Sequence, residues 1–193
     1  MTSKLVNRKN INQPLWLLAE VTYRCPLHCV FCYNPVDYAK QHEELDTKHW
    51  IKVLNEGREL GAAQLGISGG EPLLRNDLEE IVKEARSLGY YINLITSGIG
   101  LTEKRIENLK NAGLDHIQLS FQDSTKEMND FLSSTKTFEL KNKVADLIKK
   151  YDYPMVLNCV LHKLNIAHIR EILDMAEKMG AEYVELANTQ FYS

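Results

Sequence analysis

The sequence predicts an α/β fold built on a six-stranded parallel sheet. Segments with strand character and segments with helix character alternate strictly along the 193 residues. Such alternation is typical of βαβ units, which place their strands parallel to one another. Residues that favour helix starts and helix ends stand at the expected boundaries, and several strands carry polar residues on one face only.

The expected strands are short apolar runs, and each gap between them holds one expected helix. In chain order the strands are 15–21, 63–68, 91–96, 116–121, 155–160 and 183–187. The helices are 47–60, 76–88, 103–112, 138–150 and 166–179. Residues suited to N-caps precede the first three helices: Asp46 or Thr47, Asn76 or Asp77, and Thr102. Glycines suited to the left-handed position after a helix follow four of them: Gly61, Gly89, Gly113 and Gly180.

The strands distinguish two faces of the sheet. In 116–122, Gln118 and Ser120 alternate with apolar residues, and Asn158 and Glu185 lie opposite apolar neighbours on later strands. A parallel sheet that is packed on both faces would be apolar on both. A polar inner face instead suits an open barrel that holds a ligand and water. A flat doubly wound sheet also tolerates polar strand ends, so the alternation alone leaves both arrangements open.

Composition sets the class of protein. The chain has 44% hydrophobic and 25% charged residues, which is usual for a soluble globular protein. We expect residues 1–13 to form a flexible polar tail and 14–193 to form one domain. The net charge of −3 gives no reason to expect nucleic-acid binding. We find neither a signal peptide nor an apolar run long enough to enter a membrane, so we expect a cytoplasmic protein whose cysteines stay reduced.

Three cysteines after the first strand predict a metal centre. Cys25, Cys29 and Cys32 follow the spacing Cys-x3-Cys-x2-Cys. Unequal gaps between thiolates favour an iron–sulfur cluster over zinc. A cubane with three protein ligands keeps one iron open for chemistry. A zinc site completed by His28 or His42 is the alternative, although structural zinc sites usually bring two pairs of ligands.

Two further features bear on this site. The fourth cysteine, Cys159, falls on the helix-packed face of its strand, so we interpret it as a small buried hydrophobic residue. The run Gly69-Gly70-Glu71-Pro72 directly follows the second strand. Ligands bind at the carboxyl ends of parallel strands, and paired glycines let backbone approach a ligand closely. A surface turn that ends in proline is the alternative for this run.

These motifs resemble those of the radical SAM enzymes, which use S-adenosylmethionine (SAM). Members carry three cysteines at these gaps with an aromatic residue before the last, here Phe31. The runs 16–29, 120–123 and 185–190 look like the group that acts in pyrroloquinoline quinone (PQQ) synthesis, the PqqE group. The likeness extends from Pro14 onward. It implies a partial (β/α)6 TIM-like barrel of the radical SAM type, open on one side.

The resemblance also implies roles for individual residues. Cys25, Cys29 and Cys32 would hold a [4Fe-4S] cluster, and the backbone beside Phe31 would contact the adenine of SAM. The Gly69-Gly70-Glu71 motif would bind the amino group of SAM. Polar residues at other strand ends would bind its ribose hydroxyls and carboxylate: Ser120 and Asn158, with Thr96 and Ser97 as similar candidates. Four further polar residues either face the substrate or simply make the inside of the barrel polar: Glu185, Gln118, Gln122 and Asp123.

The function implied is that of an oxidoreductase in PQQ biosynthesis. Such an enzyme joins a glutamate and a tyrosine side chain of the precursor peptide PqqA through a 5′-deoxyadenosyl radical. Expected partners are that peptide, the peptide chaperone PqqD and a flavodoxin-like reductant. Relatives continue into a cysteine-rich region with auxiliary clusters, which this chain lacks, so we expect it to be the N-terminal portion of a longer protein. The alternatives are another radical SAM peptide maturase or cofactor-synthesis enzyme, or a catalytically silent iron–sulfur module.

Overall fold

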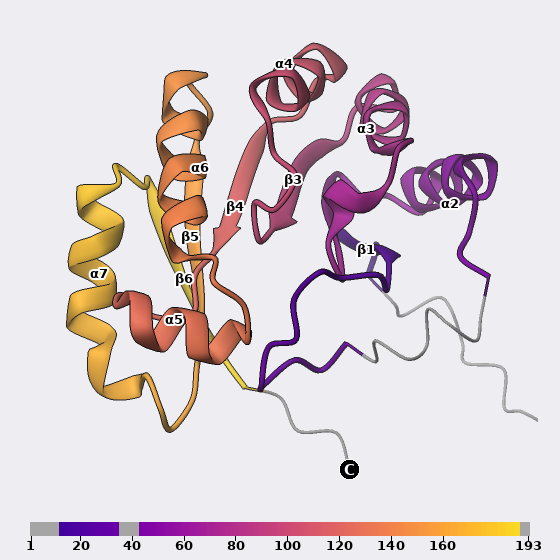
Figure 1. Cartoon of the computed structure of the whole chain (residues 1–193). Coiled ribbons are helices and arrows are strands. Elements are labelled where there is room, and N and C mark those ends of the chain that lie inside the picture. Colours follow the sequence, from indigo (N-terminus) through magenta and orange to yellow (C-terminus); the bar gives the residue numbers. More distant parts are fainter. Residues whose placement is uncertain (1–11, 35–42, 190–193) are drawn as a thin grey trace, which may run out of the picture.

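The computed structural model describes residues 12–34 and 43–189 and contains one parallel sheet (Figure 1). Its six strands are hydrogen-bonded in chain order, β1 to β6. Their bounds are β1 (Trp16–Thr22), β2 (Gln64–Gly69), β3 (Tyr91–Thr96), β4 (His116–Ser120), β5 (Met155–Leu161) and β6 (Tyr183–Asn188). All six match the predicted strands to within one residue at either end.

The strand order decides between the two arrangements that the sequence left open. A doubly wound sheet reverses its strand order at a switch point, whereas this sheet proceeds in one direction throughout. Right-handed crossovers that all run in one direction place every helix on the same face. Strands β1 and β6 are the two edges of the sheet and do not pair with each other. The fold is therefore a partial α/β barrel, open between β1 and β6, as predicted.

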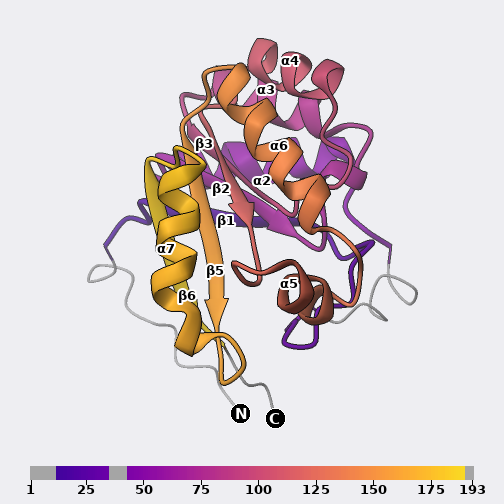
Figure 2. The ribbon, with the colours of Figure 1, turned by 60° about the vertical axis from the view of Figure 1, so that its left-hand side comes forward.

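The helices cover the outer face of the curved sheet (Figures 1 and 2). The predicted ones appear as α2 (Thr47–Glu59), α3 (Leu78–Ser87), α4 (Glu103–Ala112), α6 (Phe138–Lys150) and α7 (Ile169–Lys178). Two of them start later than predicted. Residues 76 and 77 form a turn between the 3-10 turn Pro72–Leu74 and α3, and the 3-10 turn Ile166–His168 leads directly into α7. Along the described part of the chain, no helix is both long and apolar enough to cross a bilayer.

One helix was not predicted. Helix α5 (Lys126–Ser133) lies between β4 and α6 and begins after Thr125, whose side chain accepts a hydrogen bond from the Met128 amide (3.4 Å). It is only eight residues long, too short to show a convincing apolar stripe in the sequence. It also closes on Ser134, a non-glycine residue in the left-handed region (φ 52°), so no glycine marks its end.

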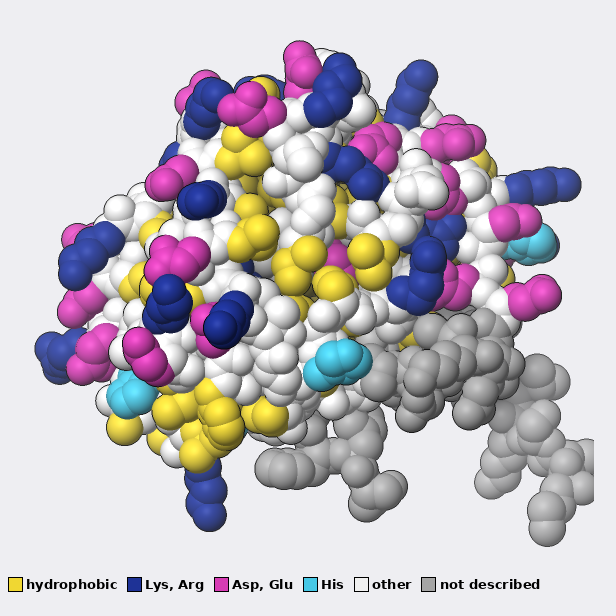
Figure 3. All heavy atoms as spheres, viewed as in Figure 1, with side chains coloured by type: hydrophobic (Ala, Val, Ile, Leu, Met, Phe, Trp, Pro, Cys, Tyr) yellow, Lys and Arg dark blue, Asp and Glu magenta, His cyan; other side chains and the backbone are white. Residues whose placement is uncertain are grey.

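The hydrophobic core lies between the sheet and the helices. Ile92, Leu94, Ile117 and Cys159 point outward from their strands and have no exposed surface. Cys159 therefore occupies the helix-packed face, as predicted. Charged side chains of both signs are interspersed over the helical face seen in Figure 3, in keeping with the net charge of −3.

The predicted helix boundaries are confirmed with one exception. The side chains of Asp46 and Thr102 cap α2 and α4. Each accepts a hydrogen bond from the backbone amide three residues further along the chain. The four glycines after the helices all have positive φ: Gly61, Gly89, Gly113 and Gly180. The exception is Asp77, which precedes α3 but makes no capping bond; its carboxylate instead binds the guanidinium of Arg75 at 2.8 and 2.6 Å.

Candidate functional site

The three cysteines of the motif lie in one loop that leaves the carboxyl end of β1. Cys25 and Cys29 are half-buried and Cys32 is exposed. Helix α5 holds the loop in place, because the His28 and Val30 amides donate to the carbonyls of Ser133 (3.3 Å) and Leu132 (3.0 Å). The helix that sequence reasoning missed is thus the support of the cysteine loop. Within 12–34 and 43–189, no three Cys, His, Asp or Glu side chains converge on the position of a single metal ion.

The glycine pair after β2 packs against the chain that enters this loop. The Gly70 amide donates to the Thr22 carbonyl (2.6 Å), and the Glu71 amide donates to the Arg24 carbonyl (2.8 Å). A Cβ on Gly69 would lie 2.2 Å from the Thr22 oxygen, and one on Gly70 would lie 2.3 Å from the Arg24 oxygen. We predicted that these glycines let backbone approach a ligand. In the structure they let it approach the end of β1 and the residues that lead to the first cysteine.

Glu71 is fully buried and joins the ends of β2 and β3. Its carboxylate accepts from the Thr96 hydroxyl (2.6 Å), the Ser97 amide (2.8 Å), the Ser97 hydroxyl and the Leu73 amide (3.1 Å). Burial raises the pKa of Glu71, and these four donors act in the opposite direction. The structure therefore brings together three residues predicted at the site, Glu71, Thr96 and Ser97, but they bind one another.

Lys141 is a functional candidate that the sequence interpretation did not include. It lies on α6, is fully buried, and its ammonium donates to the Gln122 side-chain carbonyl. Burial lowers the pKa of Lys141 to about 8, and the negative forms of Cys29 and Glu71 raise it. A buried ammonium is unfavourable unless a negative group balances it. We interpret the Lys141 ammonium as a buried positive charge that balances a negative group bound beside Cys29.

This interpretation predicts a stability change that can be measured without any cofactor. Lys141→Met should stabilise the metal-free chain at pH 7 by about 1–2 kcal/mol, because it removes a buried charge at the cost of one hydrogen bond to Gln122. Between pH 8 and 10.5 only the unfolded chain keeps the proton of Lys141, so this residue makes the stability of the wild type rise with pH. Urea unfolding at pH 7 and pH 9.5 should show a smaller rise in the free energy of unfolding for the variant than for the wild type. An equal rise in both proteins would contradict the interpretation.

Burial affects the thiols strongly. Desolvation raises the pKa of Cys29 to about 11 and also raises that of Cys25, while the nearby Lys141 ammonium lowers both. Cys159 is buried in the core, and burial raises its pKa to about 12. Its position among core side chains is consistent with our interpretation of Cys159 as a packing residue.

An inner cavity of about 290 Å³ lies beside the cysteine loop. The loop contributes Phe31, Cys32 and Tyr33, and the strands contribute inward-facing residues such as Asn158. The Asn158 side-chain carbonyl is buried and has no hydrogen-bond partner within the described residues. Ser120 pairs with Asn158 in the β4–β5 register, so the two predicted ligand residues stand at the same level of the sheet.

His162, just after β5, stacks on Phe31 with ring centroids 5.1 Å apart. The Leu164 amide donates to its Nδ1 atom (3.2 Å), so in the neutral ring the proton is on Nε2. Burial lowers the pKa of His162, which favours this neutral form. The Nε2 atom is buried and finds no partner in the described part of the chain. A donor without an acceptor is costly, so this N–H is suited to a bound group beside Phe31.

Two of the residues considered for substrate contact do not fit that role. The Gln122 side chain binds Lys141 of α6. Asp123 is fully buried, and its carboxylate binds the His168 imidazole at 2.7 Å. Both residues follow β4, where the chain has already turned toward the helices, so strand alternation no longer predicts their direction. Gln118 and Glu185 do line the inner cavity.

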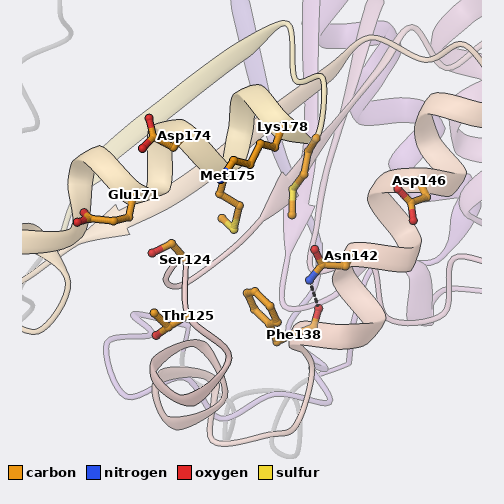
Figure 4. A pocket seen from close by; sticks show the side chains of 10 residues that line it. Ser124, Thr125, Phe138, Asn142, Asp146, Glu171, Asp174, Met175 and Lys178 are labelled. Carbon is orange, nitrogen blue, oxygen red and sulfur yellow. Dashed lines mark hydrogen bonds between the residues drawn. The ribbon is translucent and has the colours of Figure 1, made fainter.

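A larger hollow of about 590 Å³ lies on the outer face between α5, α6 and α7 (Figure 4). Phe138 and Met175 form apolar parts of its lining, and Asp146, Glu171 and Asp174 are its acidic residues. No cysteine is among its lining residues. We therefore place the functional site in the smaller inner cavity, beside the cysteine loop.

Comparison with known families and structures identifies the class of protein. A model of the radical SAM superfamily matches residues 19–176, and the chain belongs to this superfamily. Its members are enzymes that use a [4Fe-4S] cluster and SAM. These are the cofactors of this chain as well.

Several solved structures share the fold. The chain is 20% identical to SuiB of Streptococcus suis bound to the precursor peptide SuiA, with a TM-score of 0.82 over 93% of this chain and 40% of that one. It is 19% identical to anSMEcpe with bound AdoMet (TM-score 0.77, 92% and 52% covered). TYW1 with a lysine-pyruvate adduct is 16% identical (TM-score 0.71, 92% and 65%). The chain thus spans between 40% and 65% of the length of these proteins.

The residues present suit the two cofactors. Three thiols in one loop are the ligand type that iron–sulfur clusters require. The buried Lys141 ammonium supplies positive charge near Cys29, where a cluster with thiolate ligands would bring negative charge. The free Nε2–H of His162 and the unpaired Asn158 carbonyl provide a donor and an acceptor for a polar ligand. The donor set therefore fits, and the resemblance drawn from the sequence is confirmed at the level of the superfamily.

Proposed function

We propose that this radical SAM enzyme modifies a peptide, and that it forms the glutamate–tyrosine carbon–carbon crosslink of PQQ biosynthesis in the precursor PqqA. The observation that carries the proposal is the inner cavity, which places Cys32 and Phe31 of the cysteine loop beside inward-facing strand residues. The shared fold of SuiB, solved with its precursor peptide SuiA, and of anSMEcpe, also solved with the peptide Kp18Cys, supports a peptide substrate. The likeness of 16–29, 120–123 and 185–190 to the PqqE group supports the specific reaction.

The geometry and the resemblance to the radical SAM enzymes support a division of labour among these residues. Cys25, Cys29 and Cys32 hold the cluster, and Lys141 offsets its negative charge. Phe31, Ser120 and Asn158 orient SAM in the cavity. Gly69, Gly70 and Glu71, with Thr96 and Ser97, fix the neighbouring strand ends and present their backbone to SAM. When bound, cluster and SAM together supply a 5′-deoxyadenosyl radical that abstracts hydrogen from an unactivated carbon, and the protein orients the reactants and limits water.

The cysteine pKa values predict how assembly of the cluster depends on pH. Iron binds the thiolate, and burial raises the pKa of Cys29 to about 11, so a proton must leave this thiol as iron binds. Cluster assembly should therefore be more complete at pH 8.5 than at pH 6.5. Iron content after anaerobic reconstitution at the two pH values measures this. An equal or lower content at pH 8.5 would contradict it.

The crosslinking proposal is tested on the complete gene product. The reconstituted protein is incubated with SAM, reductant and PqqA, and the peptide mass is measured. A loss of about 2 Da, which is two hydrogens, with fragments that link the glutamate and the tyrosine would support the assignment. SAM cleavage with an unchanged peptide mass would reject PqqA as the substrate and favour another radical SAM maturase or cofactor-synthesis enzyme.

Further parts of the proposal concern the surroundings of the enzyme. The peptide chaperone PqqD and a flavodoxin-like reductant are the proposed partners. A reducing cytoplasm suits a site that depends on free thiols. We also propose that residues 14–193 form the radical SAM core domain. A silent iron–sulfur module remains the second candidate, and it would bind iron but leave SAM intact.

A further inference from the structure

The inner cavity carries one charge among its described lining residues. That charge is the carboxylate of Glu185 on β6. Much of the remaining lining is apolar and includes Trp16 and Leu18 of β1, Ile95 of β3 and Val160 of β5. Trp16 and Leu18 are about half exposed (51% and 40%), so their side chains are available to a ligand.

A chain of hydrogen bonds holds Glu185 as an acceptor. The Asn93 side-chain amide donates to the Gln118 carbonyl (2.9 Å), and the Gln118 amide donates to Glu185 Oε2 (2.7 Å). With its oxygen engaged by Asn93, Gln118 must turn its NH2 group toward the carboxylate. Gln118 is only 6% exposed, so this orientation is fixed by packing as well.

This chain of hydrogen bonds crosses the curved sheet and leaves one oxygen of the Glu185 carboxylate available. Strands β4 and β6 are not neighbours, since β5 lies between them. Long side chains on the concave face nevertheless bring Gln118 and Glu185 together. No donor within 12–34 or 43–189 binds the second carboxylate oxygen, Oε1, and Glu185 is exposed. The cavity therefore combines an apolar wall with a fixed, accessible negative group.

We infer that Glu185 selects the substrate by binding a basic side chain, lysine or arginine, of the peptide. This inference rests on the proposed peptide-modifying function. Lysine and arginine carry a long apolar stem and a cationic head, which match the apolar wall and the carboxylate of the cavity. A cation is favoured over a neutral donor because hydrogen bonds between opposite charges are the stronger ones. The peptide then presents its reacting residue to the cysteine loop from an anchor at β6.

The test uses the reconstituted complete gene product with SAM bound, and two small peptides as probes. These are acetyl-Gly-Lys-Gly-amide and its norleucine counterpart, which keeps the stem and lacks the ammonium. We expect the wild type to bind the lysine peptide about tenfold more tightly, since a charged hydrogen bond in an open cavity contributes about 1.5 kcal/mol. Titration calorimetry or ligand-observed NMR measures both affinities.

Three variants locate the effect. Glu185→Gln keeps the size of the side chain and should abolish the preference for lysine. Gln118→Leu removes the donor that orients the carboxylate and should reduce the preference by a few fold. Glu177→Gln removes an exposed carboxylate on α7, on the outer side of the sheet, and should keep the full preference.

Several outcomes would overturn the inference. They are equal binding of the two peptides, no detectable binding of either, tighter binding of the norleucine peptide, and a preference for lysine that survives Glu185→Gln. A fall in SAM affinity as large as the fall in lysine affinity would assign the carboxylate to SAM instead. Failure of the proposed function is recognised separately, because it shows as absence of SAM cleavage in the wild type or as an unchanged mass of PqqA, whatever the two small peptides do.

Discussion

Cys29→Ser is expected to abolish the cluster. Cys29 is the middle ligand of the motif and the thiol on which the Lys141 charge acts. A serine hydroxyl has nearly the same size but is a hard, weakly acidic ligand, which iron–sulfur clusters do not favour. After anaerobic reconstitution the wild type should hold about four irons per chain, as a cubane requires, and the variant close to none.

The matched control for this prediction is Cys159→Ala. Cys159 is also a buried thiol, but it belongs to the core between sheet and helices. Its replacement should leave the iron content unchanged and cost only a little stability, since one small core atom is lost. Iron bound equally by the wild type and Cys29→Ser, or lost in Cys159→Ala, would show that the cluster is held elsewhere.

Gly70→Ala should disturb both the fold and the cysteine loop. The added Cβ would lie 2.3 Å from the Arg24 oxygen and 2.7 Å from its carbonyl carbon, which are backbone atoms one residue before Cys25. Neither partner can swing away as a side chain can. We expect a loss of about 3 kcal/mol or more in the free energy of unfolding, at the upper end of overpacking effects. Reconstituted iron should fall as well, because the loop must shift.

Gly66→Ala is the control for this substitution. Gly66 lies on the same strand, β2, but its added Cβ would meet the side-chain ends of Trp16 (3.0 Å) and Leu18 (3.2 Å). Both side chains are partly exposed and can move, so the cost should stay below about 1 kcal/mol. Urea unfolding of the two variants compares them. Similar stabilities would show that the close contact of Gly70 with Arg24 is not a constraint.

Much of the fold follows from local patterns in the sequence. The six strands and five of the helices could be predicted because each has a clear apolar periodicity and a boundary residue. The polar inner face could be read from Gln118, Asn158 and Glu185, which do line the cavity. The alternation of polar and apolar residues could not decide between an open barrel and a flat sheet. That choice depends on the strand order, which is set by how successive crossovers pack.

The sequence was less informative about contacts between distant segments. Nothing near Glu71 indicates that Thr96, at the end of β3, and Ser97, directly after it, would engage its carboxylate. The support given by α5 to the cysteine loop likewise involves backbone carbonyls, which carry no signal in the sequence.

Lys141 differs from these cases, because a signal was present. It lies on the buried stripe of α6 with Val144, Ala145 and Ile148, at helical spacing. A lysine on the apolar stripe of a helix conflicts with the pattern around it, and such conflicts are expected at functional sites. The same reasoning explains why the inner carboxylate Glu185 could be named in advance, whereas its link to Gln118 could not.

The most direct test of the central claim is the cleavage of SAM by the reconstituted protein. The chain is loaded with iron and sulfide under anaerobic conditions, reduced with dithionite, and assayed for 5′-deoxyadenosine. Product formed by the wild type and absent in Cys29→Ser would support a working radical SAM site at this loop. A wild type that holds about four irons per chain and yet leaves SAM intact would contradict the account and favour a module that only binds.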